Sequence, residues 1–196
     1  MVESMRRTPA DVTDQFGRAA ALYLEKRYGA AYSIYEDLAS DGVVWAYVRL
    51  GGMYRDGLGV SANVEKALQW FTKAIDAGSV EALFYAGRLL TDENRHSEAL
   101  PLYQAAARQN YVPAIYRLGR TYRDGAGVPV DDRLATEFFT RAATMGNVFA
   151  KRELIVRQIK AGSALGRLKG TVAFSQLLWE AIRTKVKDRY SVNLTG

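Results

Sequence analysis

The residue types that carry out most enzyme chemistry are scarce in this chain. It has no cysteine, and His96 is its single histidine. A nucleophilic site needs a hydroxyl or thiol beside a base and an orienting acid, and no motif around His96 supplies such a set. Metal-ligand spacing is also missing. We therefore expect His96 to be a solvated loop residue, and we expect no catalytic residues, no metal site and no cofactor.

Two glycine-rich segments invite comparison with phosphate-binding loops. They are DGLGV at residues 56–60 and DGAGV at residues 124–128. A phosphate loop of this kind needs a preceding strand and a lysine followed by serine or threonine, and both are missing. Asp56 and Asp124 recur in register, which a catalytic carboxylate pair has no reason to do. Turn geometry explains the glycines, and capping or solvation explains the carboxylates.

The same segments mark an internal repeat. AYVRLGGMYRDGLGV at residues 46–60 aligns with AIYRLGRTYRDGAGV at residues 114–128, and a diverged copy begins with ALFYAGRLL at residue 82. Small residues recur at spacings of 32 or 36 in several registers at once: Gly51, Gly87 and Gly119; Ala67, Ala99 and Ala135; Ala74, Ala106 and Ala142.

Each copy is predicted to form a helix, a loop and a second helix. Ala46, Leu50 and Tyr54 recur every four residues, which places them on one helix face. Asn63 is suited to cap the second helix, and Gly78 is suited to end it in the left-handed conformation. The middle copy is four residues shorter, because TDENRH replaces the double-glycine loop.

The pattern AxxxLGxxYxxGxGVxxxxxKAxxWFxKAxxxG, met by residues 46–78, resembles the Sel1-like repeat, a relative of the tetratricopeptide repeat. Residues 114–146 match almost as well, with Leu134 where Lys66 stands, and the short middle copy is closer to the tetratricopeptide form. The resemblance implies an all-α fold, a right-handed α-solenoid of helix-turn-helix repeats, that acts as a scaffold or adaptor. In bacteria such proteins are associated with envelope, polysaccharide, signalling or host-interaction systems.

The predicted solenoid covers residues 11–150, in units at about 11–45, 46–81, 82–113 and 114–149. A basic helical tail or cap follows at residues 151–196. Residues 1–150 carry 17 Lys/Arg and 18 Asp/Glu, whereas residues 151–196 carry 10 and 3. The net charge of +6 therefore belongs to the tail.

A solenoid of this type binds partners along its concave face, which the first helix of each repeat lines. The repeat register places an apolar or aromatic step and a ladder of arginines on that face. These predicted partner-binding residues are Val48, Phe84, Tyr116, Arg55, Arg88, Arg120 and Arg123. Arginine beside aromatic rings is typical of interface hot spots, and the guanidinium group suits carboxylates. We expect a protein or peptide partner of acidic character; alternatively, the arginines pair with Asp56, Asp124 or Glu81 and keep the face soluble.

Apolar residues of the tail form a helical stripe, and basic residues flank it. The stripe consists of Leu165, Leu168, Val172, Phe174, Leu178, Trp179, Ile182 and Val186. Three interpretations remain open: a cap on the solenoid, an interfacial amphipathic helix on an anionic membrane, and a helix that docks on another subunit or a second copy. The predicted contact residues are Phe174, Trp179, Lys185 and Lys187. No recognition motif accompanies the charge, so nucleic acid is not an expected partner.

Two functions stay open. The first is a non-catalytic bacterial scaffold that brings a partner to a complex or a membrane, and the second is a regulatory subunit or inhibitor that binds an enzyme. The N-terminus has no apolar stretch behind Arg6 and Arg7, so it does not resemble a secretory signal. We expect a cytoplasmic protein, peripheral to the membrane if the tail binds lipid. A chain whose signal had been removed would look the same and would be periplasmic.

Overall fold

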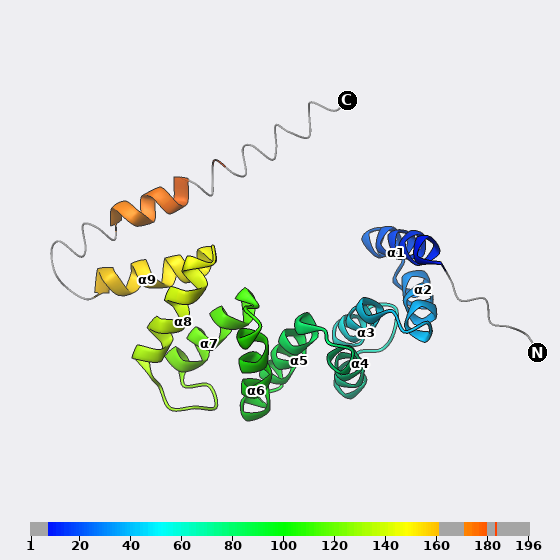
Figure 1. Ribbon diagram of the computed structural model, residues 1–196, viewed down its shortest axis with the longest axis horizontal. Helices are drawn as coiled ribbons and strands as arrows, with labels where there is room; N and C mark the ends of the chain where they lie inside the picture. The colour runs from blue at the N-terminus through cyan, green and yellow to red at the C-terminus, as the bar shows by residue number, and fades with distance from the viewer. Residues whose placement is uncertain (1–7, 161–170, 180–182, 184–196) are drawn as a thin grey trace, which may run out of the picture. The chain divides into compact units, whose positions relative to one another are not determined.

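The computed structural model describes residues 8–160, 171–179 and 183, and no strand occurs within these ranges (Figure 1). The helices are α1 (Pro9–Leu24), α2 (Tyr28–Ser40), α3 (Val44–Asp56), α4 (Val64–Asp76), α5 (Val80–Asp92), α6 (His96–Arg108), α7 (Val112–Asp124), α8 (Asp132–Thr144) and α9 (Val148–Lys160). Residues 171–179 are also helical. The chain divides into two compact units, Met1–Tyr111 with α1 to α6 and Val112–Gly196 with α7 to α9.

Neighbouring helices pair into repeats within each unit. In the first unit α1 packs on α2, α3 on α4, and α5 on α6, while in the second unit α7 packs on α8. The predicted helix-loop-helix copies and the all-α solenoid fold are confirmed. The side chain of Asn63 accepts a hydrogen bond from the Lys66 amide at 2.8 Å, and Gly78 ends its repeat with φ +88°.

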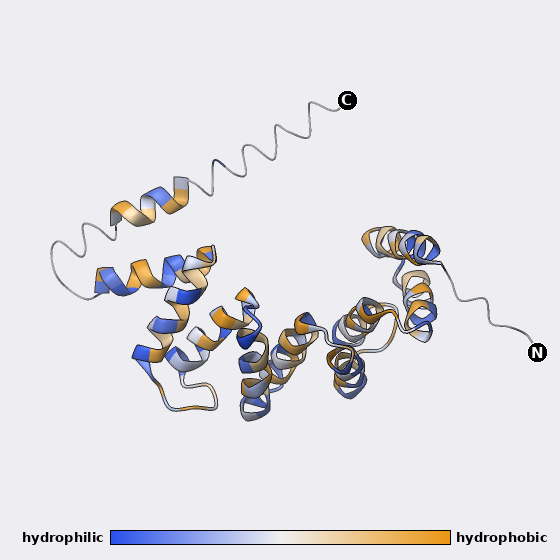
Figure 2. Cartoon of the chain, in the orientation of Figure 1, coloured by the Kyte–Doolittle hydropathy of each residue, from blue (hydrophilic) through white to orange (hydrophobic). Residues whose placement is uncertain are grey.

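A glycine in the first helix of three repeats makes room for an aromatic ring from the second helix. The pairs are Gly51 with Phe71, Gly87 with Tyr103, and Gly119 with Phe139. A β-carbon added to these glycines would lie 2.6, 2.8 and 2.7 Å from the nearest ring atom, closer than real β-carbon contacts allow. All three rings are buried, and so is the alanine four residues before each ring. The alanine and the ring form the centre of each repeat, and apolar and polar residues alternate around the helices (Figure 2).

The double-glycine loop between α3 and α4 also contacts the preceding repeat. Gly59 has φ +76°, and a β-carbon there would lie 2.7 Å from the carbonyl carbon and oxygen of Tyr28 at the start of α2. Glycine is therefore required at position 59 for two reasons: the backbone is left-handed, and it lies close to another backbone.

Candidate functional site

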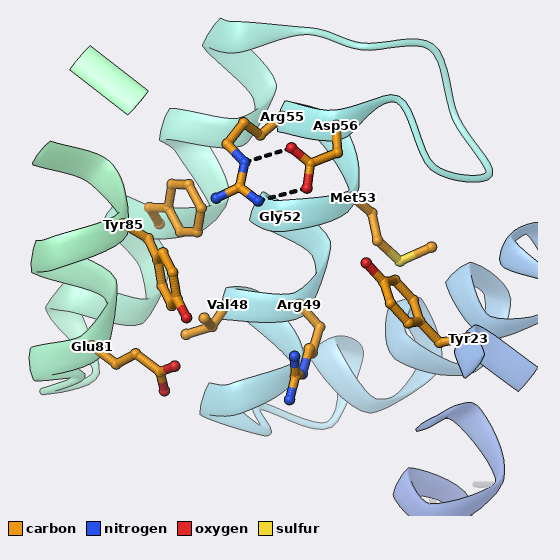
Figure 3. Close-up of a pocket in the computed structure, with 10 residues that line it drawn as sticks. Tyr23, Val48, Arg49, Gly52, Met53, Arg55, Asp56, Glu81 and Tyr85 are labelled. Atoms are coloured by element: carbon orange, nitrogen blue, oxygen red, sulfur yellow. Dashed lines mark hydrogen bonds and ion pairs between the residues drawn. The ribbon is translucent and has the colours of Figure 1, made fainter. Parts of the chain in front are cut away.

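Helices α1, α3 and α5 of the first unit, together with Phe71 of α4, line a small pocket (Figure 3). Its lining residues are Tyr23, Val48, Arg49, Gly52, Met53, Arg55, Asp56, Phe71, Glu81 and Tyr85. The cavity measures about 100 Å³. Pockets for small molecules and cofactors measure roughly 300–1,000 Å³, whereas a cavity of about 150 Å³ accepts a benzene molecule. The cavity is therefore smaller than a pocket for a small molecule or cofactor and has room for about one ring or side chain.

The floor of the pocket is apolar and buried. Val48, Met53 and Phe71 are all buried residues that line it. The expectation that Val48 is an exposed groove residue is wrong, because Val48 is only 9% exposed. It belongs to a core cluster with Ala82 and Ala86, since α5 of the next repeat covers this part of α3.

Tyr85 of α5 forms one wall of the pocket (Figure 3). Its ring stacks on Phe71 with the centroids 6.1 Å apart and the planes at 21°. Burial, followed by the nearby charge of Glu81 and a hydrogen bond with it, raises the pKa of Tyr85. The phenol is therefore neutral in neutral solution, and the apolar wall carries one hydrogen-bonding group.

Sequence reasoning assigned the aromatic position of the groove to Phe84, but Tyr85 is the aromatic residue of α5 that lines the pocket. The ring of Phe84 packs against Tyr103 of α6 at 6.0 Å and against Tyr111 at 5.6 Å between centroids. Arg49 and Tyr85 were missed, although they lie 36 residues apart and hold equivalent places in successive repeats. The repeat spacing relates these two positions but does not distinguish them from Val48 and Phe84, which are also 36 residues apart.

The rim of the pocket holds an ion pair between adjacent residues. The Arg55 guanidinium donates from Nε to Asp56 Oδ1 at 2.7 Å and from Nη2 to Oδ2 at 2.5 Å. This hydrogen bonding lowers the pKa of the Asp56 carboxyl. The guanidinium carbon lies 6.0 Å from the centroid of the Tyr85 ring. Arg55 is therefore fixed by a carboxylate on its own helix, as the alternative interpretation of the arginines required.

Charges of both signs line the ends of α3 and α5. Arg88 lies 3.9 Å from Asp92, and its charge also contributes to lowering the pKa of Asp56. Arg49 differs, because it is exposed and forms no ion pair within the ranges that the structure describes. Arg49 and Glu81 project at the end of the pocket away from the Arg55–Asp56 pair (Figure 3). These two residues are the charged groups best placed to meet a partner.

The second unit carries the remaining predicted groove residues on α7. The ring of Tyr116 lies 5.8 Å from Phe139 and 6.0 Å from Phe149 between centroids. Arg123 donates to both carboxylate oxygens of Asp124, at 2.7 and 3.0 Å, and its Nη1 lies 2.9 Å from Glu153. These hydrogen bonds lower the pKa of Asp124, to which the charge of the half-buried Arg120 also contributes. Tyr116 and Arg123 thus already contact side chains of their own unit.

The residues outside the groove are placed as follows. Phe174 and Trp179 lie on helix 171–179 and are exposed, whereas Lys185 and Lys187 lie outside the described residues.

His96 begins α6 and is half-buried, so the expectation of a solvated loop histidine is wrong. Across the described ranges, no group of three acidic or histidine side chains is arranged to hold a metal ion. None of the helices described there combines the length and apolarity that crossing a bilayer requires.

Residues 46–79, 82–111 and 112–147 each match the model of the Sel1 repeat, and together they make up about half of the chain. The chain belongs to the Sel1-repeat family. The middle Sel1 repeat matches although it lacks the double-glycine loop, and its Gly87 packs on an aromatic ring as Gly51 and Gly119 do.

Two curated relatives of this Sel1-repeat chain are fungal proteins. The ERAD-associated E3 ubiquitin-protein ligase component HRD3 of Candida glabrata is 33% identical over 73 residues, covering 37% of this chain and 9% of that protein. Chitin synthase regulatory factor 3 of Schizosaccharomyces pombe is 29% identical over 159 residues, covering 74% of this chain and 17% of that protein. The chain therefore spans less than a fifth of the length of these relatives.

The fold is shared with a bacterial Sel1-repeat structure. The crystal structure of a Sel1 repeat protein from Oxalobacter formigenes aligns with a TM-score of 0.70 at 23% identity, over 86% of this chain and 75% of that chain. This likeness confirms the solenoid fold.

Proposed function

We propose that this chain is a non-catalytic interaction scaffold that binds a protein segment along α1, α3 and α5. The observation that carries the proposal is the pocket between the first helices and Phe71 of α4, with a buried floor of Val48, Met53 and Phe71 and a wall formed by Tyr85. An aromatic wall over a desolvated floor is the arrangement in which protein interfaces concentrate their binding energy. The pocket holds one apolar side chain of the partner as an anchor.

The charges at the rim define what lies beside that anchor. Arg55 and Arg88 lie near carboxylates of this chain, and Arg49 is the exposed cation of the pocket. A carboxylate of the partner beside Arg49 gains an ion pair without breaking one. Glu81 favours a donor at the neighbouring position of the partner. The partner segment therefore carries an apolar anchor next to one acidic residue. The arginine ladder had suggested several acidic residues in the partner, whereas the pocket calls for one, beside Arg49.

The relatives support a role in assembling or regulating other proteins. One is named as a component of a ubiquitin ligase. The other is named as a regulatory factor of chitin synthase, and 74% of this chain aligns with that regulatory factor. The second name favours the alternative in which this chain is a regulatory subunit of an enzyme. The two functions differ in whether the bound enzyme keeps its activity.

Affinity capture with chemical cross-linking and mass spectrometry tests the proposal. The bait proteins are the wild type, Tyr85→Ala and Arg49→Glu, with Arg18→Glu as the control because Arg18 is an exposed arginine of α1 outside the pocket. We expect one set of partners to be captured by the wild type and by Arg18→Glu and lost from both pocket variants. Arg49→Glu replaces an exposed side chain and should keep the thermal unfolding of the wild type. Equal capture by all four proteins would show that the pocket is not the binding site. Assaying a captured enzyme with and without this chain then separates scaffold from regulator.

A further inference from the structure

The helix at residues 171–179 has the packing register of a second helix in a repeat. Ala173 and Leu177 lie four residues apart and are half-buried. They hold the places of Ala67 and Phe71, the buried alanine and ring of α4. They face α9 across a pocket that Lys151, Leu154 and Ile155 line from the other side. α9 in turn buries Ala150 in register with the first alanine of each preceding repeat. The two helices therefore form a terminal repeat.

The two residues at the centre of this terminal repeat differ in size from those of the other repeats. Ile155 occupies the place that Gly51, Gly87 and Gly119 hold in the other repeats. Leu177 replaces the aromatic ring that those glycines receive. A larger residue on the first helix is thus matched by a smaller one on the second. The inner face of helix 171–179 therefore lies toward α9.

The outer face of the same helix is apolar where the internal repeats are polar. Val172, Leu178 and Trp179 are 49%, 54% and 67% exposed. The equivalent residues of α4 are Lys66, Thr72 and Lys73, all exposed, and those of α8 are Leu134, Thr140 and Arg141, so the positions of Leu178 and Trp179 are polar in both helices. Large apolar side chains exposed together on one helix, here beside Ser175, normally mark a surface that binds protein or lipid. Figure 2 shows apolar residues toward both ends of this helix.

Charge decides which surface covers this outer face. Residues 151–196 carry 10 Lys/Arg and 3 Asp/Glu, and Lys151 and Arg152 are exposed on α9. Two copies joined through this face would bring like charges together, which opposes association. An anionic bilayer attracts these charges, and its interface accepts tryptophan and aliphatic side chains. We propose that the outer face of helix 171–179, formed by Val172, Leu178 and Trp179, docks on an anionic membrane surface. This second contact is independent of the groove.

Co-sedimentation of the full chain with vesicles tests the proposal. One set of vesicles is pure phosphatidylcholine and the other also contains phosphatidylserine. We expect binding to the anionic vesicles to exceed binding to the neutral vesicles by about tenfold and to weaken as salt is added. Leu178→Glu and Trp179→Glu should each reduce binding to the anionic vesicles by about tenfold. Thr72→Glu, at the position of α4 equivalent to Leu178, introduces the same group on an internal repeat and should leave binding unchanged.

Three results would overturn the proposal. The first is no binding to the anionic vesicles, or equal binding to both kinds. The second is a dimer, detected by sedimentation velocity, that Trp179→Glu dissociates, because the face would then belong to a second copy. The third is a loss of thermal stability in Trp179→Glu without lipid that Thr72→Glu does not share, because the face would then be packed within the chain.

Discussion

The ring of Phe71 occupies the space that a β-carbon on Gly51 would fill. The added carbon would lie 2.6 Å from Phe71 Cε1, whereas at the next residue, Gly52, it would meet no atom within 4 Å. Both glycines are in α3, and neither has a positive φ. The two positions therefore separate the effect of packing from the effect of helix propensity.

Gly51→Ala should lower the free energy of unfolding by about 1–3 kcal/mol, because the buried Phe71 ring must shift. Gly52→Ala should raise it by about 0.5–1 kcal/mol, because alanine favours the helix. Urea denaturation followed by circular dichroism measures both changes. Equal effects of the two substitutions would contradict the close packing of Phe71 on Gly51.

Gly59→Ala should destabilise the protein more than Gly78→Ala. Both residues have a left-handed backbone, with φ +76° and +88°, so both substitutions incur a strain of about 1–2 kcal/mol. Only Gly59 also lies against the Tyr28 backbone. The difference between the urea midpoints of the two variants measures the effect of the contact with Tyr28. A difference of zero would show that the loop can move away from Tyr28 at no cost in stability.

Asp56→Asn should change how stability depends on pH. Hydrogen bonding from Arg55 lowers the pKa of Asp56 in the folded protein, so its contribution is complete above the pKa of the unfolded chain and is lost as the pH falls through the folded pKa. The wild type should exceed the variant at pH 7 by about 0.5–1 kcal/mol, a value reduced for solvent screening of this exposed carboxylate. We expect the difference to shrink between about pH 5 and pH 3. Urea titrations at several pH values measure it, and a constant difference would exclude this ionisation as its source.

Ile155→Gly and Leu177→Phe should partly compensate each other. Each substitution alone leaves a gap or a clash between α9 and helix 171–179, whereas together they recreate the pair of an internal repeat. We expect a favourable coupling of about 0.5 kcal/mol or more in a double-mutant cycle based on thermal unfolding. Strict additivity would indicate that the two residues do not pack as a repeat.

The repeat and its core could be predicted because they depend on spacing alone. Ala46, Leu50 and Tyr54 define the inner face of α3 by their period of four, and all three are buried. Caps such as Asn63 and Gly78 act on neighbouring residues, so the local sequence carries their signal.

The groove residues were harder to predict because they depend on the next repeat. Val48 is buried because α5 covers it, and no spacing within α3 reveals where that cover ends. Successive helical residues point about 100° apart, so an error of one position exchanges Phe84 for Tyr85. The Arg55–Asp56 pair remained one of two alternatives in the sequence, because neighbouring residues do not face each other on a regular helix and spacing could not decide in its favour. The pair forms at the last residue of α3, before Gly57 turns the chain away.

The close packing of an aromatic ring on a glycine has a consequence for how this chain can diverge. Gly51 and Phe71 pack together in the interior of the repeat, whereas Arg49 and Glu81 are exposed at the pocket. Substitutions at these two positions should therefore change which partner is recognised while the packing of the repeat is retained. One scaffold of this kind can acquire a new partner by a few surface substitutions, and descendants of the same gene can serve unrelated complexes without a new fold.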